Sequence, residues 1–497
     1  MKRALQNFVT QINHYKRVTS NTFKMNNYNE MKHSFYKQLL AAVLLVVFSA
    51  NMASAKIVLP SVFSDNMVLQ QNSEVAIWGW GDAGENLKIV ADWNTTDTLK
   101  VKANNSGKWM ATLKTVAAGG PYAVRIMGSN NVELKNVMLG EVWICSGQSN
   151  MEWSVNSTIL NGEEEAAKAN HPNIRIFHIQ KIGAEYPQQT CNATWTVCSP
   201  ETMRSSSAVG YFFARELQQK LNVPVGIIVS AWGGTPAEVW IEKSRIENNE
   251  ELYKNRYTEK YDWWPGEPGI LYNSMIAPVV PFGIAGAIWY QGESNCGNHK
   301  IYASLLKTLI ENWRSDFKKE FPFYFVQIAP YSYGESGTSE YLREQQARTE
   351  KIVANTGMVV VSDLVDNIKD IHPRNKLDVG KRLANFALAE TYKQKIGAYK
   401  SPAFQSMQVT GNEIRLTFEN VLTGLKSTGK VPMQFLVAGT DQKFVPAAAK
   451  IDGKNILVSS KEIANPVAVR FCFDDTSMPD VFSSEGLPLA PFRTDNW

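Results

Sequence analysis

The pattern of hydrophobic and polar positions changes twice along the chain. From residue 56 to about residue 137, short hydrophobic runs alternate with polar and turn residues, which is typical of β-strands. From about 138 to 400, wholly apolar runs alternate with stretches that have helical spacing. After residue 401 the short alternating runs return. The pattern predicts an N-terminal β domain (56–137), an α/β domain (138–400) and a C-terminal β domain (401–497).

The middle part predicts a parallel sheet with helices on both faces, because buried parallel strands are apolar throughout and are joined by helices. The first expected strand is Val142–Cys145, at the start of this part. The further expected strands are Ile174–Ile179, Val225–Val229, Ile284–Trp289, Phe323–Ile328 and Met358–Val361. The expected helices are Ala208–Leu221, Tyr302–Phe317, Tyr341–Ala354 and, approximately, Leu377–Lys395.

The flanking parts have the pattern of sandwich-like β domains. Val75–Trp78 and Leu87–Val90 flank the turn residues Gly81–Gly84, which predicts a hairpin. Val409–Leu416 contains a Gly-Asn turn between alternating residues. The two terminal β parts could also pack together as one unit.

Residues 1–55 are interpreted as a leader that contains a secretory signal peptide. Lys37 precedes the apolar run Leu39–Phe48, and the small residues Ala53-Ser54-Ala55 follow as a cleavage site. The run is too short to span a bilayer. A start at Met31 gives a signal of ordinary length, so residues 1–30 are interpreted as an upstream extension from a misjudged start. The mature protein is expected to be periplasmic or extracellular, with no membrane attachment.

Removal of the leader reverses the sign of the net charge. Seven of the 51 basic residues and one of the 47 acidic residues lie in 1–55, which leaves 44 basic and 46 acidic residues. The formal charge therefore changes from +4 to −2. A basic surface for nucleic acid is not expected. The aromatic content of 11% suits a protein that stacks on sugar rings.

The cysteine content excludes a fold built on disulfides, because the five cysteines are an odd number. Cys191 and Cys198 lie close in a polar stretch and are the pair expected to bond in an oxidising compartment. Cys145 belongs to a buried strand and is interpreted as a packing residue.

The apolar run Val142–Cys145 stops at Ser146-Gly147, and Ser149 follows between two amide residues. This pattern predicts a tight turn that holds Ser149 at the edge of the sheet, where ligands bind in α/β folds. Ser149 is thus a candidate nucleophile. The alternative is a serine that caps the following helix.

A base for Ser149 has to come from the four histidines outside the leader, and His372 is the candidate. Asp370-Ile371-His372-Pro373 follows the strand that ends at Val361, so His372 is expected at the same sheet edge as Ser149. Asp370 can orient its ring, as in a Ser-His-Asp triad. His299 stays open as an alternative, and His171 and His178 are interpreted as structural. None of the four has a metal-ligand spacing, so we expect neither a metal nor a cofactor.

Two further strand ends carry residues suited to the same chemistry. Ser230-Ala231-Trp232-Gly233-Gly234-Thr235 contains paired glycines whose backbone N–H groups can approach an anion. Tyr290-Gln291-Gly292-Glu293-Ser294-Asn295 supplies three polar side chains. Together the strand ends indicate a serine hydrolase.

At these positions the chain resembles the SGNH (GDSL-like) hydrolases, and within them the sialate O-acetylesterase and carbohydrate acetylesterase group. The resemblance rests on Gly147-Gln148-Ser149-Asn150-Met151, Trp232–Thr235, Trp289–Asn295, Asp370–Pro373 and the closing segment Gly486–Asp495. The first of these differs from the GxSxG elbow of α/β-hydrolases.

The resemblance implies Ser149 as nucleophile, His372 as base, and an oxyanion hole made of the N–H groups of Ser149 and of Gly233 or Gly234. Gln291 is the side-chain donor expected there, because a carboxylate would repel an oxyanion; Glu293, Asn295 and Trp232 are assigned to substrate binding or loop orientation. Many SGNH enzymes have an Asp three residues before the His, where this chain has Lys369. Asp363, Asp366 or a backbone carbonyl could therefore replace Asp370 as the third member.

The predicted function is a secreted esterase that removes O-acetyl groups from a carbohydrate, with O-acetylated sialic acid as the first expected substrate. Acetylated xylan or another polysaccharide is the alternative substrate. A non-catalytic carbohydrate-binding protein is the alternative from another class, and a protease fits the resemblance less well.

Overall fold

The computed structural model describes residues 33, 37, 38, 56–334 and 338–497. The core of the predicted signal peptide, 39–55, lies outside the described residues. The chain divides into two units, Met1–Ile57 and Val58–Trp497, and the elements below belong to the second. Within the described ranges, no helix has both the length and the apolar character needed to cross a membrane.

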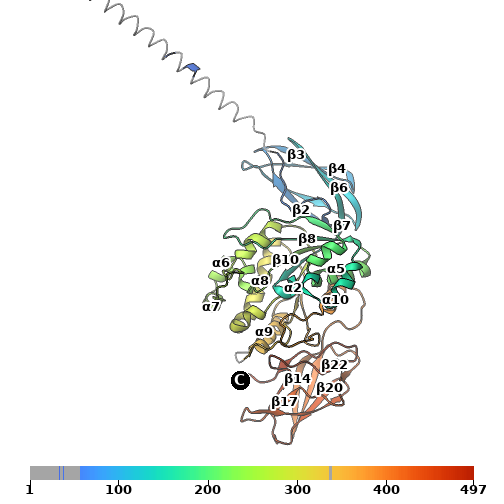
Figure 1. Cartoon of the computed structure of the whole chain (residues 1–497), viewed down its shortest axis with the longest axis vertical. Coiled ribbons are helices and arrows are strands. Elements are labelled where there is room, and N and C mark those ends of the chain that lie inside the picture. Colours follow the sequence, from blue (N-terminus) through green and yellow to red (C-terminus); the bar gives the residue numbers. More distant parts are fainter. Residues whose placement is uncertain (1–32, 34–36, 39–55, 335–337) are drawn as a thin grey trace, which may run out of the picture. The chain divides into compact units, whose positions relative to one another are not determined.

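A mostly parallel sheet occupies the middle of this unit, as the apolar runs predicted (Figure 1). Its spatial order is β13-β12-β11-β7-β10-β8-β9, and β9 at one edge runs antiparallel to β8. The strands are β7 (Asn131–Gly147), β8 (His171–His178), β9 (Trp195–Cys198), β10 (Val225–Ala231), β11 (Gly286–Tyr290), β12 (Phe323–Val326) and β13 (Thr356–Val359). The chain order reverses beside β7, and such a switch point is where open α/β sheets bind ligands.

The strand β7 is longer than its neighbours because it belongs to two sheets. Its first residues alternate between exposed and buried and pair with β6 of the N-terminal part. From Val137 on, all of its residues are buried, and it pairs with β10 and β11. The domain boundary expected between residues 137 and 138 therefore falls inside one continuous strand, and that domain division stays a prediction.

Helices cover both faces of the sheet (Figure 1). On one face, α5 and α10 pack together, and Val209, Phe212 and Leu383 join a core with Trp143 and Cys145 of β7. On the other face, Trp313 of α8 contacts Trp289 of β11, with ring centroids 6.0 Å apart. The helices are α2 (Ser149–Glu152), α3 (Gly162–Ala167), α4 (Pro200–Ser205), α5 (Ala208–Leu221), α6 (Lys243–Glu247), α7 (Glu250–Asn255), α8 (Tyr302–Phe317), α9 (Ser339–Ile352) and α10 (Lys376–Phe386).

The N-terminal β part forms two sheets, and the expected hairpin is wrong. The strand β2 pairs with β5, whereas β3 pairs with β4 and β6. The turn residues Gly81–Gly84 therefore carry the chain from one sheet to the other. The strands are β1 (Val68–Gln70), β2 (Glu74–Trp80), β3 (Asn86–Ala91), β4 (Asn94–Lys102), β5 (Lys108–Lys114) and β6 (Gly119–Met127).

The C-terminal part consists of antiparallel strands around one apolar core. Two four-stranded sheets, β14-β15-β20-β19 and β18-β17-β21-β23, share this core, and β16 pairs with β22. The strands are β14 (Ala403–Thr410), β15 (Glu413–Glu419), β16 (Leu425–Ser427), β17 (Phe435–Ala438), β18 (Phe444–Pro446), β19 (Ala448–Asp452), β20 (Asn455–Ser459), β21 (Ala468–Phe471), β22 (Val481–Ser483) and β23 (Phe492–Arg493). The predicted fold class, an α/β sheet with flanking β segments, is confirmed.

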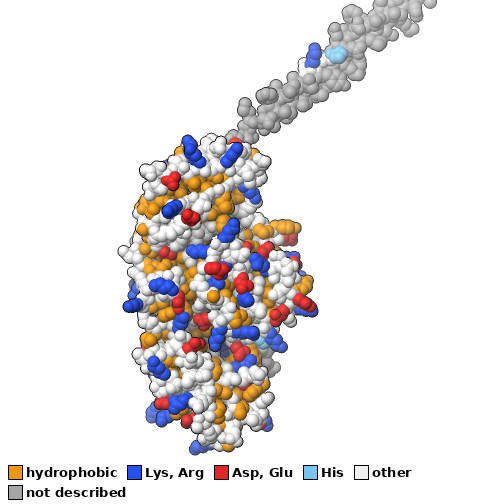
Figure 2. Space-filling model, turned by 180° about the vertical axis from the view of Figure 1, so that it is seen from behind, with side chains coloured by type: hydrophobic (Ala, Val, Ile, Leu, Met, Phe, Trp, Pro, Cys, Tyr) orange, Lys and Arg blue, Asp and Glu red, His pale blue; other side chains and the backbone are white. Residues whose placement is uncertain are grey.

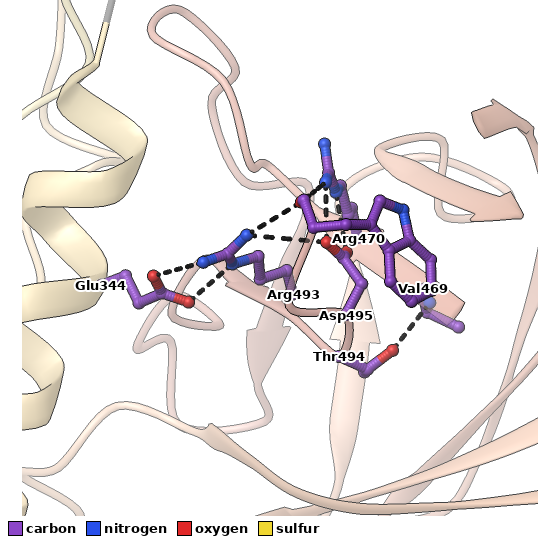
Figure 3. Close-up of polar contacts among 7 residues, drawn as sticks. Glu344, Val469, Arg470, Arg493, Thr494 and Asp495 are labelled. Atoms are coloured by element: carbon purple, nitrogen blue, oxygen red, sulfur yellow. Dashed lines mark hydrogen bonds and ion pairs between the residues drawn. The ribbon is translucent and has the colours of Figure 1, made fainter. Parts of the chain in front are cut away.

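An ion-pair cluster joins the closing segment of the chain to α9 (Figure 3). Arg493 binds Glu344 of α9 through two hydrogen bonds of 2.8 and 3.0 Å. The fully buried carboxylate of Asp495 accepts two hydrogen bonds from Arg470 and lies 3.6 Å from Arg493. A buried carboxylate that contacts two guanidinium groups is compensated for its lost hydration.

The five cysteines are free in the structure, so the expected Cys191–Cys198 pair is wrong. Cys198 is buried at the end of β9, where its thiol lies 3.7 Å from the carbonyl of Ala169. Cys191 lies 3.5 Å from the hydroxyl of Ser61 instead. The side chains diverge because β9 turns Cys198 into the core.

On the surface seen in Figure 2, basic and acidic side chains are intermixed.

Candidate active site

Ser149 lies directly beyond the end of β7, at the first position of α2. The turn depends on Gly147, whose φ of 137° suits glycine and whose added Cβ would lie 2.1 Å from the carbonyl oxygen of Tyr290. Gln148 N–H donates to that same carbonyl at 3.0 Å. Because Ser149 begins the helix, its own N–H has no carbonyl of an earlier helical turn to bind. The strand thus delivers both the hydroxyl and the N–H of Ser149 to the sheet edge.

His372 lies against Ser149, although 223 positions separate the two in the sequence. The distance from His372 Nε2 to Ser149 Oγ is 2.9 Å, which is the contact that a general base needs. The imidazole stacks on Trp153, with centroids 4.3 Å apart and planes 17° apart. Burial lowers the pKa of His372, and the positive charge of Lys376 lowers it further. A lowered pKa favours the neutral imidazole, which is the form that can accept a proton.

Asp370 lies on the other side of the imidazole. Its Oδ1 lies 3.4 Å from His372 Nδ1 and accepts the backbone N–H of His372 at 2.9 Å. The ring contact is longer than an ordinary hydrogen bond. The alternative Asp363 is bound by Arg382 through two hydrogen bonds of 2.7 and 2.6 Å. Among the acids considered from the sequence, Asp370 is therefore the one that the structure brings to His372.

Asn150, directly after the candidate nucleophile, ties the serine turn to the histidine loop. It is fully buried, and its Nδ2 donates to the backbone carbonyl of Ile371 at 3.1 Å and to Glu293 Oε1 at 2.6 Å. Its Oδ1 accepts from Lys376 Nζ at 2.6 Å. Since Ile371 precedes His372, this amide links the serine turn directly to the histidine loop.

Lys376 and Glu293 are buried ionisable groups beneath this arrangement. Burial lowers the pKa of Lys376 to about 7, against the opposing effect of Glu293. Burial raises the pKa of Glu293, while the hydrogen bond from Asn150 and the charge of Lys376 act in the opposite direction. The Lys376 ammonium also lies over the rings of Trp153 and Tyr290, at 5.4 and 5.5 Å from their centroids. Perturbed groups of this kind gather at functional sites.

The paired glycines follow β10 and lie beside Ser149. A Cβ on Gly233 would be 3.2 Å from Ser149 Cβ. The N–H of Gly233 donates to Glu152 Oε2 at 2.6 Å, and Lys181 Nζ contacts the other oxygen of Glu152 at 2.6 Å. The predicted oxyanion donor is thus at the expected place, but it binds a carboxylate of the chain itself.

Gln291 and Asn295 bind each other and lie deeper than expected. Gln291 Nε2 donates to Asn295 Oδ1 at 2.7 Å and to the carbonyl of Thr235 at 3.3 Å, so both of its N–H groups have acceptors. Gln291 Oε1 accepts from Tyr302. Asn295 Nδ2 donates to Glu238 at 2.9 Å. These amides brace the loops after β10 and β11, so an oxyanion role for Gln291 requires one of these bonds to break.

The other candidates lie around this centre. Trp232 N–H donates to the carbonyl of Gly147 at 3.1 Å, and the ammonium of Lys181 lies 5.9 Å from its ring centroid. His299 Nδ1 contacts the carbonyl of Cys296 at 2.9 Å, and its ring stacks on Tyr341. Within the described ranges, no group of three or more His, Cys, Asp or Glu residues is placed to hold a metal ion.

Sequence reasoning missed Glu152, Trp153 and Lys376. Glu152 lies three residues after Ser149 on α2, and that helical spacing was a usable signal for a shared face. Lys376 lies four residues after His372 at the start of α10, where an exposed residue would have been the ordinary expectation. Only its burial in the folded chain identifies Lys376 as a residue of the site.

The geometry resembles the minimum needed for acyl transfer: a hydroxyl, a neutral imidazole against it, an acid near the second ring nitrogen, and backbone N–H groups near the hydroxyl. The candidate nucleophile Ser149, the candidate base His372 and the candidate donor Gly233 lie in the segments that follow β7, β13 and β10. They share an edge because β13, β12, β11, β7 and β10 are mutually parallel and end on the same side of the sheet.

The family of the chain follows from its similarity to known proteins. Residues 139–389 match the family model described as carbohydrate esterase, sialic acid-specific acetylesterase. The chain is 27% identical to the human sialate O-acetylesterase over 480 residues, which cover 87% of this chain and 91% of the human protein. The mouse sialate O-acetylesterase is also 27% identical, over 511 residues and 93% of its length.

A solved structure extends the match to three dimensions. The crystal structure of a carbohydrate acetylesterase from Xanthomonas citri has a TM-score of 0.81 and 34% sequence identity, and the match covers 89% of this chain and all of that one. The family match spans half of this chain and includes each strand end described above. The chain belongs to the family of carbohydrate esterases described as sialic acid-specific acetylesterases.

Proposed function

We propose that this chain is a metal-independent serine esterase that removes O-acetyl groups from a sugar, with Ser149 as nucleophile and His372 as general base. The observation that carries the proposal is the 2.9 Å contact between His372 Nε2 and Ser149 Oγ. A neutral imidazole at this distance can take the hydroxyl proton as the oxygen attacks a carbonyl carbon.

The reaction has two halves. In the first, Ser149 Oγ bonds to the acetyl carbon, its proton passes to His372, and the sugar hydroxyl leaves with that proton. In the second, His372 takes a proton from water, the water oxygen attacks the acetyl-enzyme, and acetate leaves as the proton returns to Ser149 Oγ. Asp370 supports the imidazolium that forms in each half, because its carboxylate lies near Nδ1.

The oxyanion hole proposed here consists of the N–H groups of Ser149 and Gly233. Gly233 N–H lies next to the nucleophile but donates to Glu152. The acetyl oxygen therefore replaces a carboxylate oxygen when the substrate enters, and Glu152 keeps Lys181 as its partner. One oxyanion donor is typically worth about 2.7–4 kcal/mol to the transition state, so this exchange bears directly on turnover.

O-acetylated sialic acid is the substrate that we favour, and acetylated xylan is the second candidate. The names of the human and mouse relatives and the description of the family support the first; the relative from Xanthomonas citri is named only as a carbohydrate acetylesterase. We further propose that the chain is secreted, which the sequence of residues 31–55 supports. The contact between Ser149 and His372 argues against a protein that binds sugar without cleaving the ester.

The decisive experiment measures acetate release from 9-O-acetylated sialic acid and from acetylated xylan side by side. Ser149→Ala should abolish release from whichever substrate is cleaved. Ser304→Ala, on the outer helix α8, serves as the matched serine control and should behave as the wild type. Full activity of Ser149→Ala would overturn the mechanism. Binding of both glycans by the wild type without acetate release would instead identify a non-catalytic protein.

A further inference from the structure

The loop between α7 and residue 270 carries a cluster of aromatic side chains near the proposed active site. Tyr261, Trp263 and Trp264, called here the aromatic platform, contact one another with ring centroids 4.6–5.4 Å apart. Trp263 is 64% exposed and Tyr261 is 39% exposed. Single exposed aromatics are ordinary, but a cluster of touching exposed rings is typical of a binding surface.

The platform is attached to the glycines that flank the nucleophile. An added Cβ on Gly234 would lie 2.2–2.5 Å from atoms of the Trp264 ring, so the indole covers this glycine directly. Gly233, one residue earlier, lies beside Ser149. Because consecutive Cα atoms are 3.8 Å apart, the Trp264 ring lies within about 12 Å of Ser149 Cβ. The Trp263 ring centroid is 5.3 Å from that of Trp264, so Trp263 belongs to the surroundings of the same site.

The loop is also held firmly at its base. The backbone N–H of Tyr257 donates at 2.8 Å to Glu238, a fully buried carboxylate. Glu238 in turn accepts from Asn295 and Asn298 at 2.9 Å, in the segment after β11. The hydroxyl of Tyr261 donates to Glu259 at 2.7 Å. The exposed rings are thus presented by a braced loop, and rigid rings bind with little loss of conformational entropy.

Packing alone accounts for Trp264 but leaves Trp263 unexplained. Trp264 fills the space above Gly234, which is a structural role. Trp263 meets Tyr261 and Trp264 and leaves most of its surface to solvent. Exposure of this apolar surface to water is unfavourable. The C–H face of a pyranose ring can cover it while the sugar hydroxyls stay hydrated at the rim.

We propose that the aromatic platform is a sugar subsite, in which the exposed face of Trp263 stacks on a pyranose ring of the acetylated substrate. The inference rests on the proposed esterase function and adds to it the surface that recognises the carbohydrate. The ring is the feature that sialic acid and xylan share, so the platform by itself serves either substrate.

The test compares a substrate that reaches the platform with one that does not. The ratio of kcat/KM for an acetylated sugar to kcat/KM for ethyl acetate is measured in the wild type, Trp263→Ala and Trp263→Phe. The ratio should fall about 5- to 30-fold in Trp263→Ala, as for a stacked anchor residue, and mostly recover in Trp263→Phe. Trp497→Ala, which removes a partly exposed tryptophan at the chain end, is the matched control and should keep the wild-type ratio. Running 9-O-acetylated sialic acid and an acetylated xylo-oligosaccharide separately identifies the ring that stacks.

Binding separates failure of the subsite from failure of the proposed reaction. Calorimetry on Ser149→Ala with the same acetylated sugars measures affinity without turnover, and adding Trp263→Ala should weaken that affinity by a similar factor. An unchanged ratio and unchanged affinity in the Trp263→Ala variants would overturn the subsite. Equal losses on the sugar and on ethyl acetate would overturn it as well, because the loop would then act on the catalytic centre. Absence of acetate release from the wild type would refute the esterase and leave the affinity measurement as the test of the platform.

Discussion

Removal of the buried charge of Lys376 should move the pH dependence of the esterase. The lysine and His372 lie against the same indole: the Trp153 ring centroid is 4.3 Å from that of His372 and 5.4 Å from Lys376 Nζ. The ammonium therefore lies within about 10 Å of the imidazole. A unit charge at that distance contributes about 0.4 kcal/mol at the dielectric constant of water and about 1.7 kcal/mol at an effective value of 20. These energies are large enough for the removal of the charge to raise the pKa of His372 measurably.

The direction follows from the roles of the two groups. In the proposed mechanism His372 acts as a base only when neutral, and the positive charge of Lys376 lowers the pKa of His372. Lys376 has a pKa of about 7, so it is charged over the acidic range in which His372 titrates. Without that charge the pKa of His372 rises, because burial and Asp370 then act alone. The acidic limb of the kcat/KM profile should consequently move to higher pH.

The assay is the pH profile of acetate release for Lys376→Gln and Lys376→Met. Both variants lose the charge, but Gln keeps a donor for Asn150 Oδ1, which Lys376 Nζ now binds at 2.6 Å. The limb should shift in both, while the plateau rate should fall further in Lys376→Met because Asn150 loses the partner that holds it against the histidine loop. Lys381→Gln, exposed on the same helix, is the matched control. A limb that stays in place in both variants, or moves to lower pH, would refute the electrostatic reasoning.

Two further substitutions test the other site residues. Asp370→Asn should lower kcat/KM by about 10- to 100-fold. The loss should be smaller than in a buried triad, because the Asp370 side chain is 42% exposed and lies 3.4 Å from the His372 ring nitrogen. Asp366→Asn is the control, and an equal loss there would contradict a specific role of Asp370. Gln291→Ala should lower the free energy of unfolding in urea by about 1–3 kcal/mol, because it leaves buried partners such as Asn295 unsatisfied. A variant that keeps wild-type stability but loses turnover would instead restore Gln291 as an oxyanion donor.

Local signals in the sequence were sufficient to predict most helices and strands of the α/β part. The helices Ala208–Leu221 and Tyr302–Phe317 have the predicted ends, since an apolar stripe with polar flanks selects a helix whatever surrounds it. Apolar runs likewise identified the parallel strands of the central sheet, but not its antiparallel edge strand β9. Parallel strands end at one edge of a sheet, so the order of the elements predicted that Ser149, the paired glycines and His372 share an edge. The strands β11 and β12 separate β13 from β7, so the loop after β13 has to bring His372 to Ser149.

Partners distant in sequence required the folded chain. The strand β2 pairs with β5 rather than with β3, and Cys198 turns into the core away from Cys191. Neither outcome is encoded by neighbouring residues, because strand pairing and side-chain burial depend on the shape of surfaces formed by the whole chain.

The electrostatics of the site were likewise decided only by the folded chain. The sequence predicted Gly233 as an anion donor, but only the folded chain places the Glu152 carboxylate on its N–H. It predicted Gln291 at the sheet edge, but packing gives both of its N–H groups to acceptors within the loops. It gave no sign that Lys376 is buried, and burial is what brings the pKa of Lys376 to about 7. Residue types and their order locate the chemistry, whereas desolvation and through-space charge, which exist only once distant segments pack, tune it.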